Sequence, residues 1–413
     1  MLKYLWKNKV FLFLLILAVW LVPSTIGLSE QSQTESIVTA IGIDKQNSEF
    51  EVSLQYIVPN VSNGPEGLKI ISQKGDSVGD AVEKIKLQLG KLSGFAHCKV
   101  LVFNDKASEE NFTGLLDYLL RRKTNTNSII LINTPDSAKD LLSMSSKLDS
   151  DLYSFINNNG NPNEFGDFHD LKTIGDYYST YFSPVKCLAI NSVSVKESQN
   201  SSGDSSSSSG GSSQSSSSES SGGSLSETKK EFENKGKLTI IKNSKKLLTL
   251  TEEESDNLLW FNPNIKRDTF TIEDYSEGYL KNAKILFNIS NKIYKTKASF
   301  EGGVPHFEVS IKFYVRTGEV ISNDLKQVDY ETLQRNYSPK LLKAMEQKML
   351  SSLKLAENNF KENSYDVIKC YETFYKTKNK ELKQYLKTLS NTEDFIKTVV
   401  FDYKIEFIQG YSR

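Results

Sequence analysis

A run of serine and glycine in the middle of the chain most constrains how this sequence can fold. Residues 198–226 read SQNSSGDSSSSSGGSSQSSSSESSGGSLS and contain almost no apolar side chains. Such a segment buries too little apolar surface to offset the conformational entropy lost on folding, and Ser/Gly-rich chains behave as flexible coils. The sequence therefore predicts a flexible linker over residues 198–227 that connects two folded halves, 34–197 and 228–413.

The first 28 residues form a second special segment, which is basic at its start and then strongly apolar. Three lysines within the first nine residues precede a stretch from Val10 to Val22 in which only the indole of Trp20 is polar. This order is typical of an export signal or of an uncleaved signal-anchor, and up to Leu28 the stretch is nearly long enough to span a bilayer. Because basic residues stay on the cytoplasmic side, we expect the rest of the chain to lie outside the cytoplasm, behind an anchor or a cleaved signal peptide at 1–28.

Composition excludes several classes of function. The 413 residues include 51 basic and 51 acidic side chains, so the formal net charge is +0 and no basic surplus indicates a nucleic-acid partner. The length predicts two or three domains. The three cysteines, Cys98, Cys187 and Cys370, are far apart and form no C-x-x-C pair. We therefore expect them to act as small buried apolar residues, and not as disulfides or metal ligands.

Strands and helices alternate in the first half. Two β-rich runs within 36–57 are joined by turn residues at 44–47, which predicts a hairpin. A helix is expected within 75–90 with Ser77 as its N-cap, and a second helix is expected behind Ser108. Short apolar strands separate these helices, so the pattern predicts βαβ units packed on one sheet.

The second half is also predicted to mix strands and helices. It opens with a hairpin that turns at residues 243–244 and continues with a helical capping box at 251–254. Two long alternating strands are joined by the glycine-containing loop 301–305, a long helix begins at 338–339, and a final alternating strand covers 399–407. The predicted fold class is α+β: two or three mixed α/β domains, with mixed or antiparallel sheets flanked by helices, behind an N-terminal apolar helix.

The sequence contains no catalytic or metal-binding motif. The three histidines, His97, His169 and His306, have none of the spacings of a zinc site, and no P-loop, nucleophile elbow or dinucleotide-binding motif occurs. Asp167, His169 and Asp170 could in principle bind a cation or move protons, but the surrounding Asn- and Gly-rich loop favours solvated polar side chains. We therefore predict no catalytic, cofactor-binding or metal-binding residues, no cofactor and no enzyme activity.

Two charged features have ordinary structural explanations. Asp44 ends a strand, where capping of the following turn is the default role. The basic run Arg121–Lys123 ends a helix, where cations complement the helix dipole. A contact with a phosphate or a lipid headgroup is the alternative interpretation of that run.

The order of the motifs resembles that of the Ger(x)C family, the C subunits of spore nutrient germinant receptors. Residues 36–60 resemble the opening strands of the family, and 75–122 resemble its first two helices and the strand between them, which appears here as His97-Cys98-Lys99-Val100. In the second half, 237–261 and 294–315 are similar to the family's capped helix and long hairpin. The resemblance covers nearly all of 34–413 except the serine-rich segment.

The chain departs from the family at one chemically decisive position. Members usually carry a lipid-bearing cysteine some 16 residues before the glycine that corresponds to Gly42, which falls here near Ile26. No cysteine occurs in the first 97 residues, so a diacylglycerol group cannot be attached there. The link to the membrane is therefore expected to come from the apolar helix, or from partner proteins if that helix is removed.

The resemblance also implies a function. It implies a non-enzymatic exterior subunit of a membrane-bound spore germinant receptor, anchored on the extracytoplasmic face of the spore inner membrane, that scaffolds or gates the response to nutrients. Its implied partners are a transporter-like multi-pass membrane subunit and a second membrane subunit, and a direct small-molecule ligand is left open. Two alternatives remain: an envelope-bound hydrolase acting on the spore cortex, which needs paired carboxylates in a cleft, and a stand-alone solute sensor with a pocket between the two halves.

Overall fold

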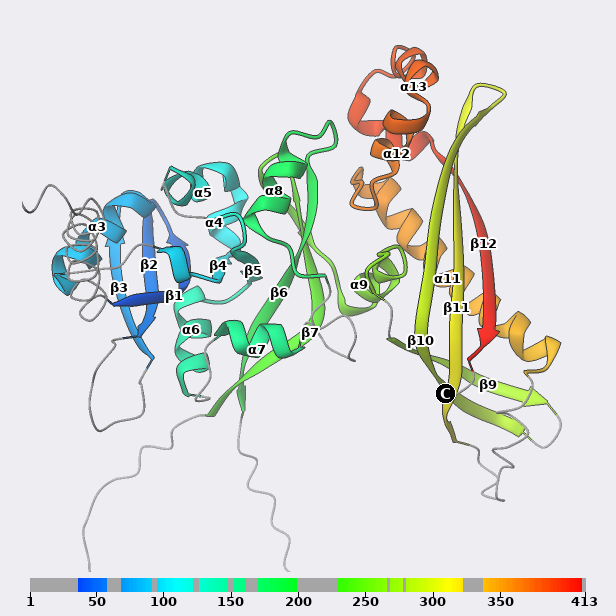
Figure 1. The fold of residues 1–413 in the computed structure, drawn as a ribbon, viewed down its shortest axis with the longest axis horizontal. Coiled ribbons are helices and arrows are strands. Elements are labelled where there is room, and N and C mark those ends of the chain that lie inside the picture. Colours follow the sequence, from blue (N-terminus) through cyan, green and yellow to red (C-terminus); the bar gives the residue numbers. More distant parts are fainter. Residues whose placement is uncertain are drawn as a thin grey trace, which may run out of the picture.

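The computed structural model describes residues 36–410, apart from 58–67, 91–94, 122–125, 148–151, 160–169, 199–228, 266–267, 278–279 and 322–336. The apolar helix predicted within 1–28 lies outside the described residues. Among the helices that are described, none combines the length and the apolar character needed to cross a membrane. Figure 1 shows two sheets, each with helices packed against it.

The first sheet has eight strands in the order β3-β2-β1-β4-β5-β6-β7-β8. The strands are β1 (Ile37–Gln46), β2 (Glu49–Ile57), β3 (Lys69–Gly75), β4 (Val100–Asn104), β5 (Ile130–Thr134), β6 (Cys187–Ser198), β7 (Lys229–Lys242) and β8 (Lys245–Thr249). The four central strands β1, β4, β5 and β6 run parallel, and antiparallel strands extend the sheet on both sides. The predicted βαβ arrangement is confirmed, and so is the hairpin of β1 and β2.

Helices cover both faces of the first sheet. They are α3 (Val78–Leu89), η1 (Phe95–His97), α4 (Asp105–Glu109), α5 (Phe112–Leu120), α6 (Ala138–Lys147), α7 (Leu152–Asn159) and α8 (Ile174–Tyr181). Because side chains alternate along a strand, Leu101 and Phe103 of β4 enter the core beneath α3, α5 and α8. Val100 and Val102 of the same strand enter the core beneath α6 and α7.

Capping side chains set the ends of these helices. α3 begins behind Ser77, whose hydroxyl accepts from the N–H of Asp80, as the sequence predicts. The prediction for α5 was wrong, because its cap is Asn111 and Ser108 lies inside the short helix α4. The Asn111 side chain accepts from the N–H of Gly114 at 2.9 Å, a role that Asn fills as well as Ser does.

The serine-rich segment connects two neighbouring strands of one sheet. Residues 199–228 lie outside the described residues, but β6 and β7 on either side of them pair in an antiparallel ladder with Ser198 opposite Lys229. β7 and β8, which follow the serine-rich segment, complete the first sheet. The division of the chain into two domains on either side of a linker at 198–227 stays a prediction.

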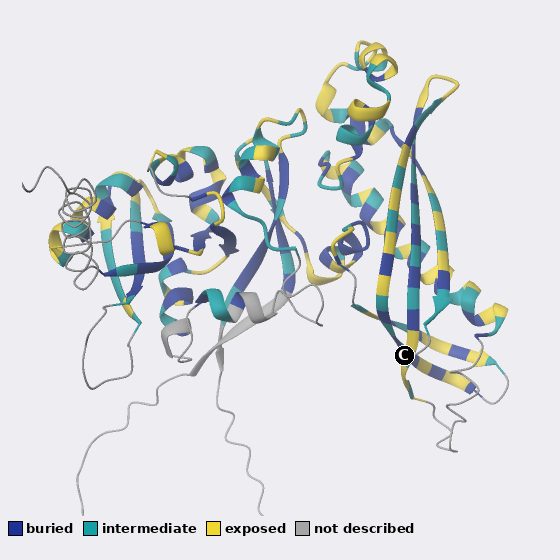
Figure 2. Cartoon of the chain, in the orientation of Figure 1, coloured by how far each residue is buried: buried dark blue, intermediate teal, exposed yellow. Residues whose placement is uncertain are grey.

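The second sheet has four strands in the order β12-β11-β10-β9. The remaining elements are α9 (Glu252–Leu259), β9 (Asp268–Glu277), β10 (Leu280–Glu301), β11 (Val304–Ile321), α11 (Pro339–Asn363), α12 (Cys370–Thr377), α13 (Asn379–Leu386), η2 (Thr392–Asp394), α14 (Phe395–Thr398) and β12 (Val400–Gln409). β12 pairs parallel with β11, and the other neighbours are antiparallel. Burial alternates along β10, β11 and β12, and α11 crosses behind the sheet (Figures 1 and 2). The predicted α+β class with mixed sheets is confirmed.

Candidate functional site

The junction between the two sheets is filled by side chains from both of them. Cys187, Leu238 and Ile240, on β6 and β7 of the first sheet, are buried in the same hydrophobic cluster as α11 and the second sheet. Relative motion of domains is the default only where the interface is small or polar. A shared apolar core therefore favours one fixed orientation of the two parts.

The turn between β7 and β8 docks on the first part of the molecule. Asn243 and Ser244 have φ values of 51° and 65°, as a two-residue hairpin of type I′ requires. The carbonyl of Ser244 accepts from the N–H of Phe112 at 2.7 Å, and its hydroxyl accepts from the N–H of Thr113 at 2.7 Å. These two N–H groups belong to the first turn of α5, where the helix itself supplies no acceptor. The turn thus completes the N-terminus of α5.

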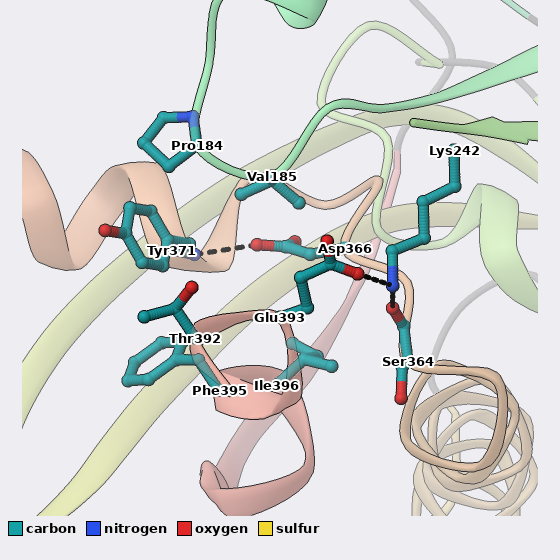
Figure 3. Close-up of a pocket in the computed structure, with 10 residues that line it drawn as sticks. All are labelled: Pro184, Val185, Lys242, Ser364, Asp366, Tyr371, Thr392, Glu393, Phe395 and Ile396. Atoms are coloured by element: carbon teal, nitrogen blue, oxygen red, sulfur yellow. Dashed lines mark hydrogen bonds and ion pairs between the residues drawn. The ribbon is translucent and has the colours of Figure 1, made fainter. Parts of the chain in front are cut away.

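The same turn binds the second part of the molecule (Figure 3). The ammonium of Lys242 lies 3.0 Å from the Glu393 carboxylate and donates to the carbonyl of Ser364 at 2.8 Å, and Asn243 donates to Glu393 at 2.9 Å. Ser364 is the C-cap of α11, so the cation also lies where the helix dipole favours positive charge. These contacts hold the pKa of Glu393 below its usual range. One hairpin turn therefore bridges α5 and the end of α11.

The cavity left at this junction is very small. It has a volume of about 30 Å³, which is room for one or two water molecules. Asp366 lines it, and its carboxylate accepts from the N–H of Cys370 at 3.0 Å and of Tyr371 at 2.8 Å. Burial raises the pKa of Asp366 to about 6 against the effect of these hydrogen bonds. Pockets for small organic ligands are about ten times larger, so this cavity is too small for such a ligand.

Asp44 has a different role from the one predicted for it. The turn of the first hairpin lies at Asn47, and Asp44 is buried near the end of β1. Its carboxylate accepts from the Ser137 hydroxyl at 3.0 Å and from the N–H groups of Ala138 at 2.7 Å and Lys139 at 3.0 Å. Burial raises the pKa of Asp44, although these three donors oppose the rise. The expected turn cap is thus a cap of α6, supplied from a distant strand.

The two described histidines lie in different parts of the fold. His97 lies in η1, and His306 on β11 contacts the Asp402 carboxylate at 2.9 Å. His169 and Asp167 lie outside the described residues, and the described residue Asp170 forms an ion pair with Lys172. Within the part of the chain that the structure describes, no group of three potential ligands could hold a metal ion.

The other charged residues considered in the sequence have local partners. Arg121 forms an ion pair with Asp117 at 2.6 Å one helical turn earlier, and the next two residues of that basic run lie outside the described residues. Glu254 closes the predicted capping box with Thr251, which is confirmed. It also accepts from the Asn359 amide of α11 at 2.8 Å.

One cluster of carboxylates has perturbed pKa values. Burial, with the nearby charge of Asp268, raises the pKa of Asp256 to about 6, and burial also raises the pKa of Asp268. Lys292, buried on β10, donates to the carbonyls of Leu259, Trp260 and Asn262 that end α9, and burial lowers its pKa to about 7. Asp256 lies on α9 and Asp268 begins β9, so these carboxylates lie near the C-terminal end of α9 together with Lys292.

Comparison with known proteins identifies the family. The family model "Spore germination protein N-terminal domain" matches residues 30–195, and the model "Spore germination B3/ GerAC like, C-terminal" matches residues 236–407. The chain belongs to the Ger(x)C family of spore germination proteins. The predicted resemblance is thereby confirmed across both halves of the sequence.

Two individual relatives agree with this assignment. Spore germination protein KC of Bacillus subtilis (strain 168) is 29% identical over 146 residues, which cover 30% of this chain and only 36% of that protein. The crystal structure of the GerBC protein matches with a TM-score of 0.50 and 17% identity, over 89% of this chain and 96% of that one. At this low identity the structural match supports the shared fold alone.

The junction residues of this Ger(x)C protein could not be selected from the sequence. The hairpin at Asn243-Ser244 was predicted, but its partners Thr113 and Glu393 are 131 and 150 residues away from it in the chain. The sequence signal that could have pointed to these residues was a two-residue type I′ turn built from Asn and Ser, without glycine. Such a turn places non-glycine residues at positive φ, which the fold tolerates where their side chains are needed.

Proposed function

We propose that this chain is the non-enzymatic exterior subunit of a membrane-bound spore germinant receptor, and that it scaffolds or gates the response to nutrients. The match of both germination-protein domain models carries this proposal. The chain is held at the extracytoplasmic face of the spore inner membrane by its apolar N-terminal segment or by its partners. Those partners are a transporter-like multi-pass subunit and a second membrane subunit.

The junction suggests how such a subunit acts. Its two parts share one hydrophobic core, and the β7–β8 turn ties α5 to the end of α11 through Ser244 and Glu393. A body with a fixed internal geometry can hold two membrane partners in register, or pass a displacement from one to the other. It does not need to open and close around a ligand to do so.

The alternative functions have weaker support. A solute sensor that binds between the two parts needs a far larger cavity there than about 30 Å³. A hydrolase needs two carboxylates that face a cleft, and Asp366 and Glu393 at the junction line a cavity of only about 30 Å³. No observation favours either of them over the receptor subunit.

Two measurements test the proposal. The tagged full chain, purified from solubilised spore membranes, is expected to carry a transporter-like subunit and a second membrane subunit with it. Spores that lack the chain are expected to lose their response to one class of nutrient and to keep the response to germinants that bypass receptors. Recovery of the chain alone, together with normal nutrient germination of the deletion strain, would rule the proposal out.

A further inference from the structure

The end of the molecule around α13 is strongly basic. Residues 376–390, which run from the last turn of α12 through α13, contain five lysines and one glutamate, although the whole chain has equal numbers of basic and acidic side chains. Lys376 forms an ion pair with Glu372. The other four lysines form no ion pair with another described residue; they are Lys378, Lys380, Lys383 and Lys387. Most of the positive charge of this end therefore remains unpaired within the described chain.

Three of these lysines lie on one face of α13. Successive residues of an α-helix are rotated by about 100°, so Lys380, Lys383 and Lys387 fall within an arc of about 60°. Gln384 extends the same face, and all four residues are exposed. The one acidic residue, Glu381, is rotated by about 100° from the nearest of the lysines. We call the face formed by these three lysines and Gln384 the basic face of α13.

The opposite face of α13 is fixed to the core. Leu382 is buried, and the ring centroid of Tyr385 lies 5.7 Å from that of Phe300 on β10 and 6.2 Å from that of Phe395. This packing sets the rotation of α13 and directs its basic face outward. Figures 1 and 2 show α13 as an exposed element that projects at one end of the molecule, near the turn between β10 and β11.

Helix electrostatics do not account for the basic face. Like charges three or four residues apart destabilise a helix, and Lys383 stands at this spacing from both Lys380 and Lys387. The helix dipole favours Lys387 at the C-cap, but it disfavours a cation such as Lys380 in the first turn. A row of cations that is unfavourable for the chain alone indicates a negatively charged partner.

The shape of this end favours a flat partner over a peptide or a small ligand. Small ligands and peptides bind in pockets and grooves, whereas α13 projects from the molecule (Figure 1). Tyr375 is exposed on α12 directly before α13, and tyrosine beside lysine is typical of protein surfaces at the headgroup level of a bilayer. Each lysine near an anionic lipid surface strengthens binding about fivefold. Charge and shape therefore both fit a bilayer with anionic headgroups.

We propose that the basic face of α13 rests on the anionic headgroups of a lipid bilayer. This inference rests on the proposed function in placing the chain at a membrane, and goes beyond it in naming the surface that lies against the lipid. A chain held only by its N-terminal segment can tilt freely, and a second contact at α13 orients it and leaves the remaining surfaces to protein partners. Because a tethered contact is intramolecular, a few weak charge contacts are sufficient for it.

Fluorescence quenching on the full chain tests this contact. A fluorophore is attached at Gln384→Cys on the basic face or at Glu319→Cys, which lies about 50 Å along β11 from the turn near α13; the three native cysteines are buried. The chain is reconstituted with vesicles of phosphatidylcholine, with or without phosphatidylglycerol, that contain a lipid with a nitroxide quencher on its headgroup. Quenching at position 384 should exceed that at 319, should require phosphatidylglycerol and should fall with added salt.

Charge variants identify the lysines as the cause. Glutamine at positions 380, 383 and 387 should weaken the contact at least about tenfold, whereas arginine at the same positions should preserve it. Glutamine in place of the exposed lysines Lys343, Lys348 and Lys354 of α11 removes the same charge and should leave the quenching unchanged. Melting curves check that each variant folds, and the salt dependence of the wild type serves if the glutamine variant does not. Equal quenching at positions 384 and 319, or quenching that persists without phosphatidylglycerol, would overturn the inference.

A crosslinking experiment separates a bilayer from an acidic protein. The photoreactive residue p-benzoylphenylalanine replaces Gln384 in the full chain in spore membranes, where adducts with lipid support the inference. Adducts with another protein or with a second copy of the chain, or the absence of lipid adducts, overturn it. The vesicles contain no other protein, so their result does not depend on the receptor. Quenching at position 384 without recovery of receptor subunits from spores would support the lipid contact and count against the receptor proposal, and the reverse result would overturn the lipid contact alone.

Discussion

The hydroxyl of Ser244 offers the sharpest test of how the junction is held together. It accepts from the N–H of Thr113 at 2.7 Å in the first turn of α5, and it lies 2.6 Å from the Thr113 hydroxyl and 3.2 Å from that of Tyr177. In Ser244→Ala the N–H of Thr113 loses its acceptor in a partly buried site. The two remaining hydroxyls keep their mutual contact at 2.6 Å, so the lost cap is the main effect.

The magnitude follows from the capping role. Replacing a capping serine by alanine costs about 1–2 kcal/mol, which matches the cost of leaving a buried donor without a partner. Ser244→Gly loses the same hydroxyl, but Ser244 has a φ of 65°, where glycine avoids a strain of about 1 kcal/mol. We therefore expect Ser244→Ala to be less stable than wild type by about 1–2 kcal/mol, and Ser244→Gly to lie between the two.

The assay combines a global and a local measurement on the full chain. Urea unfolding followed by tryptophan fluorescence gives the free energy of unfolding, and amide hydrogen exchange reports the opening of α5 at Phe112 and Thr113. Exchange at these amides should be faster in Ser244→Ala than in the wild type, while α3 remains unchanged. Equal stability of Ser244→Ala and wild type would refute the capping argument, and equal values for the alanine and glycine variants would refute the argument from backbone strain.

Three further predictions concern buried or paired groups. Burial lowers the pKa of Lys292 to about 7, so between about pH 7 and 10 the unfolded chain binds more protons than the folded chain. The free energy of unfolding should therefore rise across that window, by at most about 1.4 kcal/mol per pH unit. Urea unfolding of Lys292→Met should lack this rise. The contact with Lys242 lowers the pKa of Glu393, so the ion pair stabilises above about pH 4 and this contribution is lost as the pH falls through the lowered pKa. Glu393→Gln should cost less than about 1 kcal/mol at neutral pH, because the pair is partly exposed, and a cost that persists at pH 2 would exclude the charge as its cause. Burial raises the pKa of all three cysteine thiols, to about 12 for Cys98, so a thiol reagent should react with none of them in the folded chain and with all three in urea.

Local patterns were sufficient to predict most of the elements. The helix N-capped by Ser77, the capping box of Thr251 and Glu254 and the hairpin turn at Asn243 all occur where the sequence predicts them. These signals depend on residues that are close in the chain, so their physical chemistry can be read directly. The α11 start at Ser338 and Pro339 is of the same kind.

Predictions that needed a distant partner were less successful. Asp44 was assigned to its own turn and instead caps α6, about 94 residues later in the chain. Ser108 was predicted to cap α5, but the N-cap of this helix is Asn111. In both cases several residues of suitable chemistry are available, and packing against the rest of the molecule decides which of them meets a free N–H group.

By itself the sequence determined the class of fold, the helix caps and the order of motifs by which the Ger(x)C family is recognised, because each of these depends on neighbours in the chain. The tertiary structure alone decided that β7 and β8 complete the first sheet, that one turn joins α5 to the end of α11, and that β12 is the last strand of the second sheet. Strand order and junction contacts bring together residues far apart in sequence. Alternating apolar patterns specify that a strand is buried on one face, but they do not specify which strand lies beside it.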